Sequence, residues 1–509
     1  MTRLSTTPKT LASVNNLAPS TIAGHLMNTT PNKQSYPLPL FVDLDGTLTR
    51  SDILFESFFE LVKSNPLYVF LVLYWAINGK AYLKQKIADK VDIDASILPY
   101  QSNLVEYLHH EYTTGRKIYL ATASNKKYAQ IIAQHFGIFT DIIASSTNIN
   151  MSGKRKLAAI KEVVGDGEFE YAANSMVDMP IWEHSQTCIL VNPSRKTERL
   201  AKHRFIVTHI FKDQPANIGR YFSAIRIHQW MKNILLFLPL LTAHKINEAG
   251  LIVDTLFGAI AFSFCASSVY ILNDLLDLSA DRNHSRKRKR PFASGDIQLL
   301  HGVLMIPVLL LLSLLIAAFL SEEFLVVLIF YFLVTLAYSF ALKRIVLIDV
   351  LVLAGLYVIR VIAGSAVSGI SLSFWLLAFS MFIFLSLALA KRSAELVSLR
   401  RDEKNNTVGR GYIVQDLDYL HSMGTASGYM SVLVMALYIN SPNVMALYPN
   451  PEIIWLICPT LLYWISRVWL KTGRGEMPDD PLVFAFKDRQ SQILSVIVAI
   501  ITISATNIS

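Results

Sequence analysis

The chain has 509 residues, of which 52% are hydrophobic and 17% are charged, and its formal net charge is +9. Soluble globular proteins carry about 25% charged residues, so this composition argues against a single soluble enzyme, a disordered protein or a fibre. Three widely spaced cysteines exclude a disulfide-stapled scaffold and a cysteine-ligated zinc site. The excess positive charge lies mostly between apolar runs, which indicates membrane orientation rather than nucleic-acid binding.

The amino-terminal third of the chain reads as a tail followed by a soluble domain. Residues 1–37 are rich in Ser, Thr, Asn and Pro and poor in acids, which predicts a disordered tail without a secretory signal, with a transit peptide as the weaker alternative. In 38–205, short apolar runs that end in polar turns alternate with helical patterns, which predicts an α/β domain with a parallel sheet covered on both faces. The apolar segment 67–77 is too short to cross a bilayer. We expect it to be a buried helix, with a helix on the membrane surface as the alternative. Residues 206–227 are predicted to form a linker with an interfacial helix.

From residue 228 to residue 509 the sequence is dominated by apolar runs. Nine of them are candidate spanning helices, which predicts an all-α polytopic membrane domain. With the amino-terminal domain in the cytoplasm, the inward loops hold nineteen Lys and Arg residues and the outward loops hold one, Lys245. This asymmetry predicts an integral protein of the bacterial inner membrane whose soluble domain and catalytic loops face the cytoplasm. The runs lie near 231–243, 251–272, 302–320, 324–342, 346–367, 373–390, 425–440, 452–470 and 491–506.

Two carboxylates, Asp43 and Asp45, end the predicted strand in FVDLDGTLT. Ligands bind at the carboxyl ends of strands in an open parallel sheet. Two acids at this spacing are able to share a Mg²⁺ ion, with one acting as a nucleophile and the other as a general acid and base. The string therefore predicts a phosphoryl-transfer site.

The string DLDGTLT resembles the first motif of the haloacid dehalogenase superfamily of phosphatases. The resemblance implies that Asp43 is the nucleophile and Asp45 the acid and base. Thr122 matches the residue that holds the phosphoryl group, and Lys156, with Lys154 as a rival, matches the cation of the third motif. The insert near 50–100 would be a helical cap.

The fourth motif of that superfamily matches residues 171–178, with a departure. Ala173 and Asn174 stand where Gly and Asp are usual, and only Asp178 remains acidic. A neutral Asn ligand holds Mg²⁺ with less charge, so the domain either turns over weakly or binds without hydrolysis. The implied metal ligands are Asp43, Asp45, Asn174 and Asp178.

A second group of acids lies at the cytoplasmic end of the second candidate span, in ILNDLLDLSADRNHSRKRKR. Asp274, Asp277 and Asp281 are spaced i, i+3 and i+7, which places them on one helical face, with Asn273 one turn before Asp277. Acids beside hydrocarbon are costly and indicate a functional site. Oxygen ligands at this spacing suit a Mg²⁺ ion that is bound to a diphosphate. The groups that follow at once and suit phosphate oxygens are His284, Lys287, Arg288 and Arg290.

This string resembles the first aspartate motif, NDxxDxxxD, of the UbiA superfamily of intramembrane prenyltransferases. The resemblance implies that Asn273, Asp274, Asp277 and Asp281 bind Mg²⁺ and the diphosphate of the electrophilic substrate, with Asp274 and Asp277 as catalytic residues.

The later loops indicate which branch of that superfamily is involved. The loop after the sixth span begins with Lys391, Arg392 and Glu395, where branches that prenylate aromatic rings carry a second acid-rich motif. Arg360 lies three turns deeper than Asp349, and an Arg at that depth is expected to have an anionic partner. The second pocket is therefore expected to take an anion such as a polyprenyl phosphate. The remaining candidate substrate contacts at this mouth are Tyr338, Lys343 and Arg344.

The membrane region as a whole resembles the polyprenyl-phosphate phosphoribosyltransferase branch, whose donor is 5-phosphoribosyl diphosphate (PRPP). The resemblance implies a bifunctional enzyme that moves 5-phosphoribose to a polyprenyl phosphate, with the phosphatase-like domain removing the 5-phosphate. Two alternatives remain: an aromatic prenyltransferase acting on a quinone or haem precursor, and a catalytically inactive regulatory soluble domain. A lipid transporter is disfavoured because the spans show no inverted repeat. The sequence leaves a homo-oligomer open.

Overall fold

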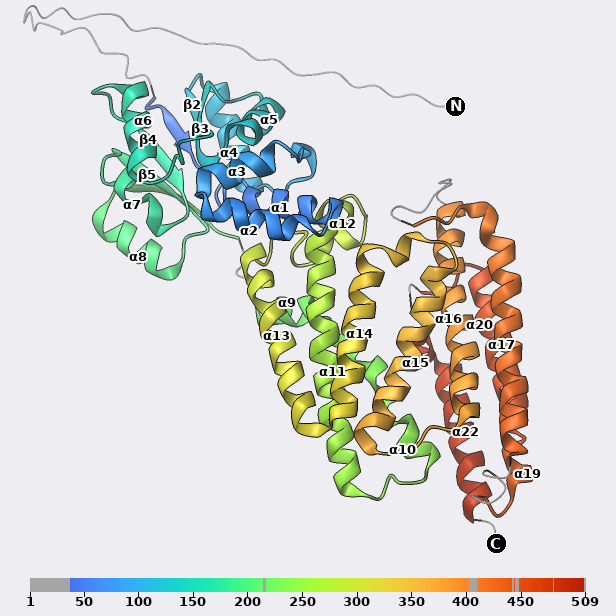
Figure 1. The fold of residues 1–509 in the computed structure, drawn as a ribbon. Helices are drawn as coiled ribbons and strands as arrows, with labels where there is room; N and C mark the ends of the chain where they lie inside the picture. The colour runs from blue at the N-terminus through green and yellow to red at the C-terminus, as the bar shows by residue number, and fades with distance from the viewer. Residues whose placement is uncertain are drawn as a thin grey trace, which may run out of the picture. The chain divides into compact units, whose positions relative to one another are not determined.

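The computed structural model describes residues 37–213, 217–401, 410–441, 444, 448–478 and 480–507. Within these residues an α/β domain is followed by a bundle of long helices (Figure 1). The predicted tail at 1–37 lies, apart from Pro37, outside the described residues. The two predicted fold classes, α/β and then all-α, are confirmed.

The α/β domain is built on six parallel strands in the order β3-β2-β1-β4-β5-β6. β1 (Leu40–Val42) lies centrally and is entirely buried, so Asp43 emerges at the middle of the carboxyl edge of the sheet. Apolar clusters cover both faces of the sheet, as the buried strand sequences require. The other strands are β2 (Ile118–Asn125), β3 (Asp141–Ser145), β4 (Glu170–Ala173), β5 (Thr187–Val191) and β6 (Val207–Phe211).

The predicted end of this domain at residue 205 is too early. β6 (Val207–Phe211) pairs with β5 and belongs to the sheet, so the predicted linker 206–227 begins with a strand. An edge strand pairs with only one neighbouring strand, and the sequence VTHIF therefore carries partly exposed polar residues. Such residues are also typical of a linker. The helix α9 (Ile218–Ala224) then leads toward the bundle.

Helices form the predicted cap and cover the sheet. The cap contains α1 (Ile53–Ser64), α2 (Tyr68–Ile77), α3 (Lys80–Ala88) and the short 3₁₀ turn η1 (Ala95–Ile97). The prediction of a buried helix at 67–77 is wrong, because most of α2 is exposed and only Trp75 is buried. The remaining elements of the domain are α4 (Ser102–Thr113), α5 (Lys126–Phe136), α6 (Lys154–Val164), η2 (Met176–Asp178), α7 (Met179–Trp182) and α8 (Arg195–Arg204).

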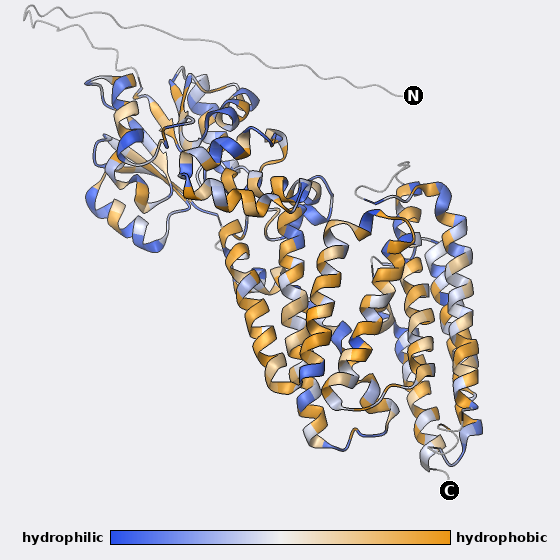
Figure 2. Cartoon of the chain, viewed as in Figure 1, coloured by the Kyte–Doolittle hydropathy of each residue, from blue (hydrophilic) through white to orange (hydrophobic). Residues whose placement is uncertain are grey.

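Eight helices in the described part of the bundle are long and apolar enough to cross a membrane. Most of their residues are hydrophobic (Figure 2), as helices in contact with lipid require. They are α11 (Ala249–Leu276), α13 (Leu299–Leu320), α14 (Glu322–Phe340), α15 (Ile348–Ser368), α16 (Phe374–Arg401), α17 (Leu417–Ile439), α20 (Ile457–Gly473) and α22 (Arg489–Asn507). Short elements join them: α12 (Leu278–Arg282), η4 (Lys287–Lys289), η5 (Leu342–Arg344), η6 (Val414–Asp416), α19 (Pro451–Ile454) and α21 (Pro481–Lys487).

The first of the nine predicted spans, at 231–243, does not form a long α-helix. It is a 3₁₀ helix, η3 (Ile227–Phe237), followed by the short helix α10 (Leu238–Thr242). Pro239 lies near the start of α10, where a missing N–H is tolerated. A 3₁₀ helix rises about 2.0 Å per residue, so this short segment covers much of the bilayer depth, and α10 lies at the end of the bundle opposite to α12 (Figure 1).

Gly364 of α15 allows η3 to pack inside the bundle. A Cβ atom at this position would lie 2.0 Å from the carbonyl oxygen of Leu236, whereas a Cβ atom at Gly355 of the same helix would meet no atom within 4 Å. We expect Gly364→Ala to lower the free energy of unfolding by about 1–3 kcal/mol. Gly355→Ala is the matched control and is expected to be neutral or stabilising. Thermal unfolding of both variants in the same detergent measures the difference, and equal stabilities would contradict the packing of η3 against α15.

Candidate active sites

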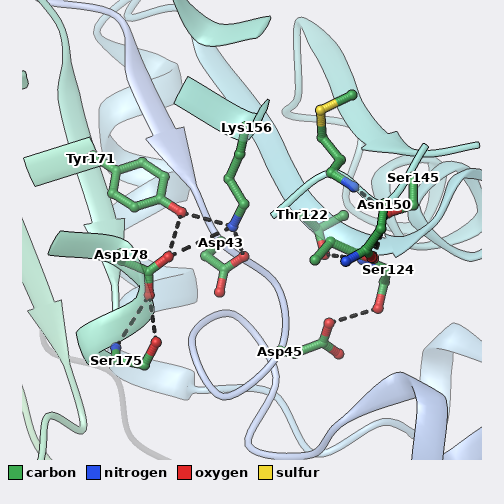
Figure 3. A network of polar contacts seen from close by, with 12 residues as sticks. Asp43, Asp45, Thr122, Ser124, Ser145, Asn150, Lys156, Tyr171, Ser175 and Asp178 are labelled. Carbon is green, nitrogen blue, oxygen red and sulfur yellow. Dashed lines mark hydrogen bonds and ion pairs between the residues drawn. The ribbon is translucent and has the colours of Figure 1, made fainter. Parts of the chain in front are cut away.

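The carboxyl end of β1 places Asp43 beside a buried lysine (Figure 3). The Nζ atom of Lys156, from α6, lies 2.7 Å from Oδ1 of Asp43 and 3.8 Å from Oδ1 of Asp178. The side chains of Lys156, Asp43 and Asp178 are 4%, 11% and 6% exposed. The rival Lys154 is exposed. The structure thus brings together the predicted nucleophile and the predicted cation, and it selects Lys156 over Lys154.

Burial raises the pKa values of both predicted catalytic acids. Desolvation raises the pKa of Asp43 to about 7, against the opposing attraction of Lys156 and with a further contribution from the negative charge of Asp178. Desolvation also raises the pKa of Asp45 to about 6, with the charge of Asp52 adding to the effect. Raised values of this kind are typical of acids that exchange protons near neutral pH.

Tyr171 is a residue of this site that the sequence reasoning missed. Its hydroxyl accepts a hydrogen bond of 2.9 Å from Lys156 and donates one of 3.1 Å to Asp178, which joins the third and fourth motifs. Asp178 also accepts hydrogen bonds from the backbone N–H and the hydroxyl of Ser175. Tyr171 lies on a buried strand, and its sequence, YAANS, indicates a core residue. No local signal therefore marked this tyrosine as part of a site.

Asp45 and Thr122 lie on the other side of the strand ends. Asp45 accepts hydrogen bonds from the backbone N–H of Ile53 and the hydroxyl of Ser124, and Figure 3 shows it turned away from Lys156. Thr122 is fully buried within β2, three residues before the strand ends at Asn125, and its hydroxyl accepts from the backbone N–H of Ser124. Ser124, which the sequence reasoning also missed, therefore joins the first and second motifs.

Asn174 lies against the turn that follows β1. A Cβ atom at Gly46, which has a φ of +75°, would lie 2.1 Å from Nδ2 of Asn174. Only glycine adopts this conformation without strain and leaves room for the amide. Asn174 is therefore close to the first motif, as its place in the fourth motif requires, and it adds an uncharged oxygen to the neighbourhood of Asp43.

The donor set at the sheet edge fits a magnesium ion in its chemistry. Asp43 and Asp178 are two carboxylates that face one ammonium group, and Mg²⁺ binds one or two carboxylates together with water and substrate phosphate. Within the described residues no three His, Cys, Asp or Glu side chains gather as a metal-binding group, in this domain or in the bundle. Ion pairs with Lys156 and with arginines hold the carboxylates in their present positions.

We expect Mg²⁺ binding to the soluble domain to weaken as the pH falls from 7.5 to 5.5. Protonated carboxyls do not bind metal, and Asp43 and Asp45, with pKa values of about 7 and about 6, gain protons in this range. The apparent dissociation constant should rise by about tenfold or more. Titration calorimetry on the full chain in two buffers with different ionisation enthalpies measures the affinity and the protons released. The Asp43→Asn variant isolates the contribution of this site, and an affinity independent of pH would contradict the assignment.

The acids of the bundle lie where α11 gives way to α12. The predicted single helical face is interrupted, because Asp277 has a φ of −102° and a ψ of +17° and separates the two helices. The hydrogen bonds from the N–H of Asp277 to Asn273 and from the N–H of Asp281 to Asp277 still follow the helical pattern. Asp274 and Asp281 consequently stay on one side and are both almost fully buried, and Asn273 and Asp277 are partly exposed.

Two arginines hold the buried acids together. Nη1 of Arg290 lies 3.0 Å from Asp274 and 2.6 Å from Asp281. Arg226, which the sequence reasoning missed, also pairs with Asp274 and stacks over the ring of Tyr270. Because Arg226 precedes η3 by one residue in a left-handed conformation, nothing in the local sequence placed it at this site.

The other predicted cations of this site are more exposed. Lys343 lies 3.5 Å from Asp277. Lys287 and Arg288 are exposed, and Nδ1 of His284 accepts hydrogen bonds from the backbone N–H groups of Arg286 and Lys287. Arg344 is exposed beside Lys343. The site therefore combines two buried, ion-paired acids with a rim of cations at the end of the bundle.

The second predicted pocket contains a closed set of ion pairs. The guanidinium of Arg392 pairs with Asp349 and Glu395, and Glu395 also pairs with Arg410 at 2.7 Å. The hydroxyl of Tyr338 donates to Asp349 at 2.7 Å. Arg392 and Asp349 are almost fully buried. In this structure they are paired with each other and are not accessible to a ligand.

Arg360 does not have the anionic partner that its depth led us to expect. Its guanidinium donates to the side-chain oxygen of Asn233 at 3.1 Å and to the hydroxyl of Tyr331 at 3.0 Å, and it also contacts the carbonyl of Leu356. Aromatic rings, including that of Tyr357, lie within 5.6 Å of it. Neutral oxygens and ring faces stabilise this cation in place of a carboxylate. Lys391 is partly buried and lies in the electrostatic field of Asp480 and Lys232, an ion pair near η3 that the sequence reasoning did not single out.

A buried ion pair connects the cap to the acidic segment of the bundle. Arg282, the last residue of α12, donates to both carboxylate oxygens of Glu56 in α1, at 3.0 and 2.5 Å. Both side chains are 6% exposed. Glu56 also accepts a hydrogen bond from the hydroxyl of Ser51, which lies in the loop after the first motif. Arg282 directly follows Asp281, so the pair links the neighbourhoods of both candidate sites.

The chain is similar to known proteins over most of its length. The UbiA prenyltransferase family matches residues 234–486. Protein y4nM of Sinorhizobium fredii is 35% identical over 464 residues, which cover 91% of this chain and 90% of that protein. Decaprenyl-phosphate phosphoribosyltransferase of Mycolicibacterium smegmatis is 29% identical over 285 residues, covering 54% of this chain and 89% of that enzyme.

The soluble domain has a likeness among solved structures. A phosphoserine phosphohydrolase-like protein from Francisella tularensis matches 34% of this chain and 95% of its own, at 12% identity and a TM-score of 0.25. The resemblance to the haloacid dehalogenase superfamily is carried by the parallel sheet and by the positions of Asp43, Thr122, Lys156 and Asp178 around its carboxyl edge. With its long apolar helices and the acidic segment at the end of α11, the carboxyl-terminal region, residues 234–486, belongs to the UbiA prenyltransferase family.

Proposed function

We propose that this chain is a bifunctional membrane enzyme. The bundle transfers 5-phosphoribose from PRPP to a polyprenyl phosphate and releases diphosphate, and the soluble domain then removes the 5-phosphate to leave polyprenyl phosphoribose. The observation that carries the proposal is the pair of buried acids, Asp274 and Asp281, held by Arg226 and Arg290 at the end of a spanning helix. The name of the Mycolicibacterium relative, a decaprenyl-phosphate phosphoribosyltransferase, supports the choice of substrates.

In the bundle, Asn273, Asp274, Asp277 and Asp281 would hold Mg²⁺. Bound there, the ion would supply positive charge to the departing diphosphate. Arg290 and the cationic rim, which includes Lys287 and Arg288, suit the donor's phosphate oxygens. In the reaction an oxygen of the lipid phosphate forms a bond to the anomeric carbon of the ribose, and the bond from that carbon to the diphosphate breaks. The lipid phosphate is already an anion, so no residue is needed as its base.

The acceptor phosphate is best placed near cations that are not locked in ion pairs with buried carboxylates. Lys343 and Arg344 lie at the exposed mouth of the bundle, and Lys391 is partly buried. Arg392, with Asp349, Glu395 and Tyr338, acts as a positioning group because its partners are internal. Arg360 retains its positive charge among neutral partners and so favours negative charge deep in the bundle.

In the soluble domain, an oxygen of Asp43 attacks the phosphorus of the 5-phosphate and the bond to the ribose oxygen breaks. Asp45 donates its proton to that oxygen and afterwards removes a proton from the water that hydrolyses the phosphoaspartate. Lys156, 2.7 Å from Asp43, would offset the charge of the phosphoaspartate, and the hydroxyl of Thr122 would donate to a phosphoryl oxygen. Mg²⁺ held by Asp43, Asp178 and Asn174 would supply charge to the phosphoryl oxygens. The active sites are proposed to face the cytoplasm of a bacterial cell.

The test is the set of products made by the purified full chain in liposomes that contain a polyprenyl phosphate. With PRPP and Mg²⁺ we expect release of diphosphate and of inorganic phosphate, and a lipid whose mass exceeds that of the polyprenyl phosphate by one unphosphorylated pentosyl residue (a pentose less one water). A lipid that retains the second phosphate would support the transfer and contradict the phosphatase step. Absence of diphosphate release, together with product formation from an isoprenyl diphosphate and a hydroxybenzoate, would replace the proposal with aromatic prenyl transfer.

A further inference from the structure

Helix α2 of the cap carries an unusually exposed apolar surface. We call Leu67, Phe70, Leu71, Leu73, Tyr74 and Ile77 the α2 apolar face. The exposed fraction of these side chains runs from 45% at Leu71 to 85% at Ile77, and Figure 2 shows α2 among the most hydrophobic segments of the soluble domain. Contiguous exposed apolar surface on this scale marks an interaction site.

The opposite side of α2 anchors the helix to the cap. Trp75 is buried in a cluster with Leu61 and Ile87, and Tyr68 and Val72 pack against the same cluster. Residues 68, 72 and 75 are spaced i, i+4 and i+7, which places them on one side of the helix. The apolar face is thus presented outward by a packed helix.

Length and charge indicate a lipid surface as its partner. Ten residues of α-helix extend about 15 Å, half of the hydrocarbon core of a bilayer, so α2 cannot cross it. The sequence from residue 64 to residue 88 contains no Asp or Glu, and its cations near α2 are the exposed Lys80 and the partly buried Lys86. Lys84 instead donates to the carbonyl of Ala123 and to Asn150 within the soluble domain. Apolar side chains flanked by cations suit the boundary between headgroups and acyl chains in an anionic leaflet.

The neighbouring helix connects α2 to the membrane-embedded part of the chain. Phe59 and Val62 of α1 belong to one buried apolar cluster with Ile271 and Leu275, in the last turns of the spanning helix α11. α1 ends at Ser64 and α2 begins at Tyr68. The exposed face is therefore continuous in the chain with a contact that already lies at the end of a membrane span.

We propose that α2 lies in the surface of the leaflet at the end of the bundle that carries Asp274, with the α2 apolar face inserted among the acyl chains. This interaction is independent of the chemistry proposed for either site. It makes the cap a membrane-binding element, so the soluble domain is held to the bilayer by its own surface as well as by the chain.

Spin labels on the full chain in liposomes with anionic lipid test the insertion. A label at Phe70→Cys should be several-fold more accessible to oxygen, which partitions into lipid, than to a water-soluble nickel chelate. The matched control is Glu162→Cys on α6, which is exposed and polar and should show the opposite ratio. The native cysteines Cys188, Cys265 and Cys458 are all buried, which favours selective labelling.

Each outcome decides the proposal. Preferential collision with oxygen at position 70, together with preferential collision with the nickel chelate at position 162, supports insertion. Equal accessibility of position 70 and position 162 to the nickel chelate overturns it. Shielding of position 70 from both reagents also overturns it and identifies a second protein copy as the occupant.

A second measurement asks whether insertion matters for lipid substrates, and it rests on the proposed function. The variant Leu73→Asp with Ile77→Asp should release phosphate from the lipid product about tenfold more slowly, with unchanged hydrolysis of soluble p-nitrophenyl phosphate. Failure of the parent chain to hydrolyse either substrate contradicts the proposed phosphatase, whereas the spin-label result still decides the insertion. Equal rates for the variant and the parent on the lipid product would show that α2 does not serve this step.

Discussion

Replacing Asp274 by Asn is expected to lower the rate of diphosphate release from PRPP by about 10³-fold, which corresponds to about 4 kcal/mol of transition-state stabilisation. The substitution keeps the size of the side chain and removes the charge that balances Arg226 and Arg290. It thereby removes a proposed ligand for the metal and leaves Arg226 and Arg290 without one of their counterions. The measurement is a coupled assay of diphosphate in liposomes that contain polyprenyl phosphate.

Asp296→Asn is the matched control for that experiment. Asp296 lies in the connection between α12 and α13, outside the acidic segment, and it is partly exposed and paired with Arg220 at 3.2 Å. Surface pairs of this kind contribute little, so this variant should retain the parental rate. If Asp274→Asn and Asp296→Asn behaved alike, the assignment of the acidic segment to the transfer reaction would be refuted.

Replacing Asp43 by Asn should abolish the release of inorganic phosphate, by about 10³-fold or more, and leave the release of diphosphate unchanged. The amide cannot serve as the nucleophile, and it also removes the partner of Lys156. The lipid that accumulates should be heavier than the parental product by one phosphoryl group. Mass spectrometry of the lipid and parallel assays of phosphate and diphosphate separate the two steps.

The control for this second experiment is Asp141→Asn on β3, an exposed carboxylate whose hydrogen bond is to the N–H of the next residue. This variant should leave the release of diphosphate and the release of inorganic phosphate unchanged. Continued phosphate release by Asp43→Asn at the parental rate would assign that activity elsewhere and would favour a regulatory role for the soluble domain.

The parts of the fold that the sequence predicted are those with strong local patterns. The parallel sheet followed from buried strands such as LFV, and the long helices of the bundle followed from uninterrupted apolar runs. The segment at 231–243 is equally apolar, yet it forms η3 and α10, because Gly364 lets the backbone of η3 approach α15 closely. That choice depends on a residue more than 120 positions away.

The site residues that lie within sequence motifs were predicted. The partner residues that come from distant segments of the chain were missed. Asp43, Lys156 and Asp178 are together as expected, but Tyr171 and Arg226 contribute through tertiary contacts that no short string reveals. The expectation of an anion for Arg360 used charge alone and did not foresee that Asn233 and Tyr331 supply neutral acceptors. The sequence analysis recognised α2 as an apolar helix. The exposure of α2 depends on the neighbouring elements of the fold, which the sequence does not show.

The ion pair between Glu56 and Arg282 has a consequence for how the two halves of the protein associate. If they were produced as separate polypeptides, each would carry a charged group that is buried in the intact chain, together with the apolar surface around Phe59 and Leu275. On separation the two charges would regain water, so the gain from re-forming the ion pair is small, and burial of the apolar surface is the main drive toward association. The apolar contact would therefore supply the affinity between separately produced halves, and the ion pair between Glu56 and Arg282 would select the geometry in which they meet.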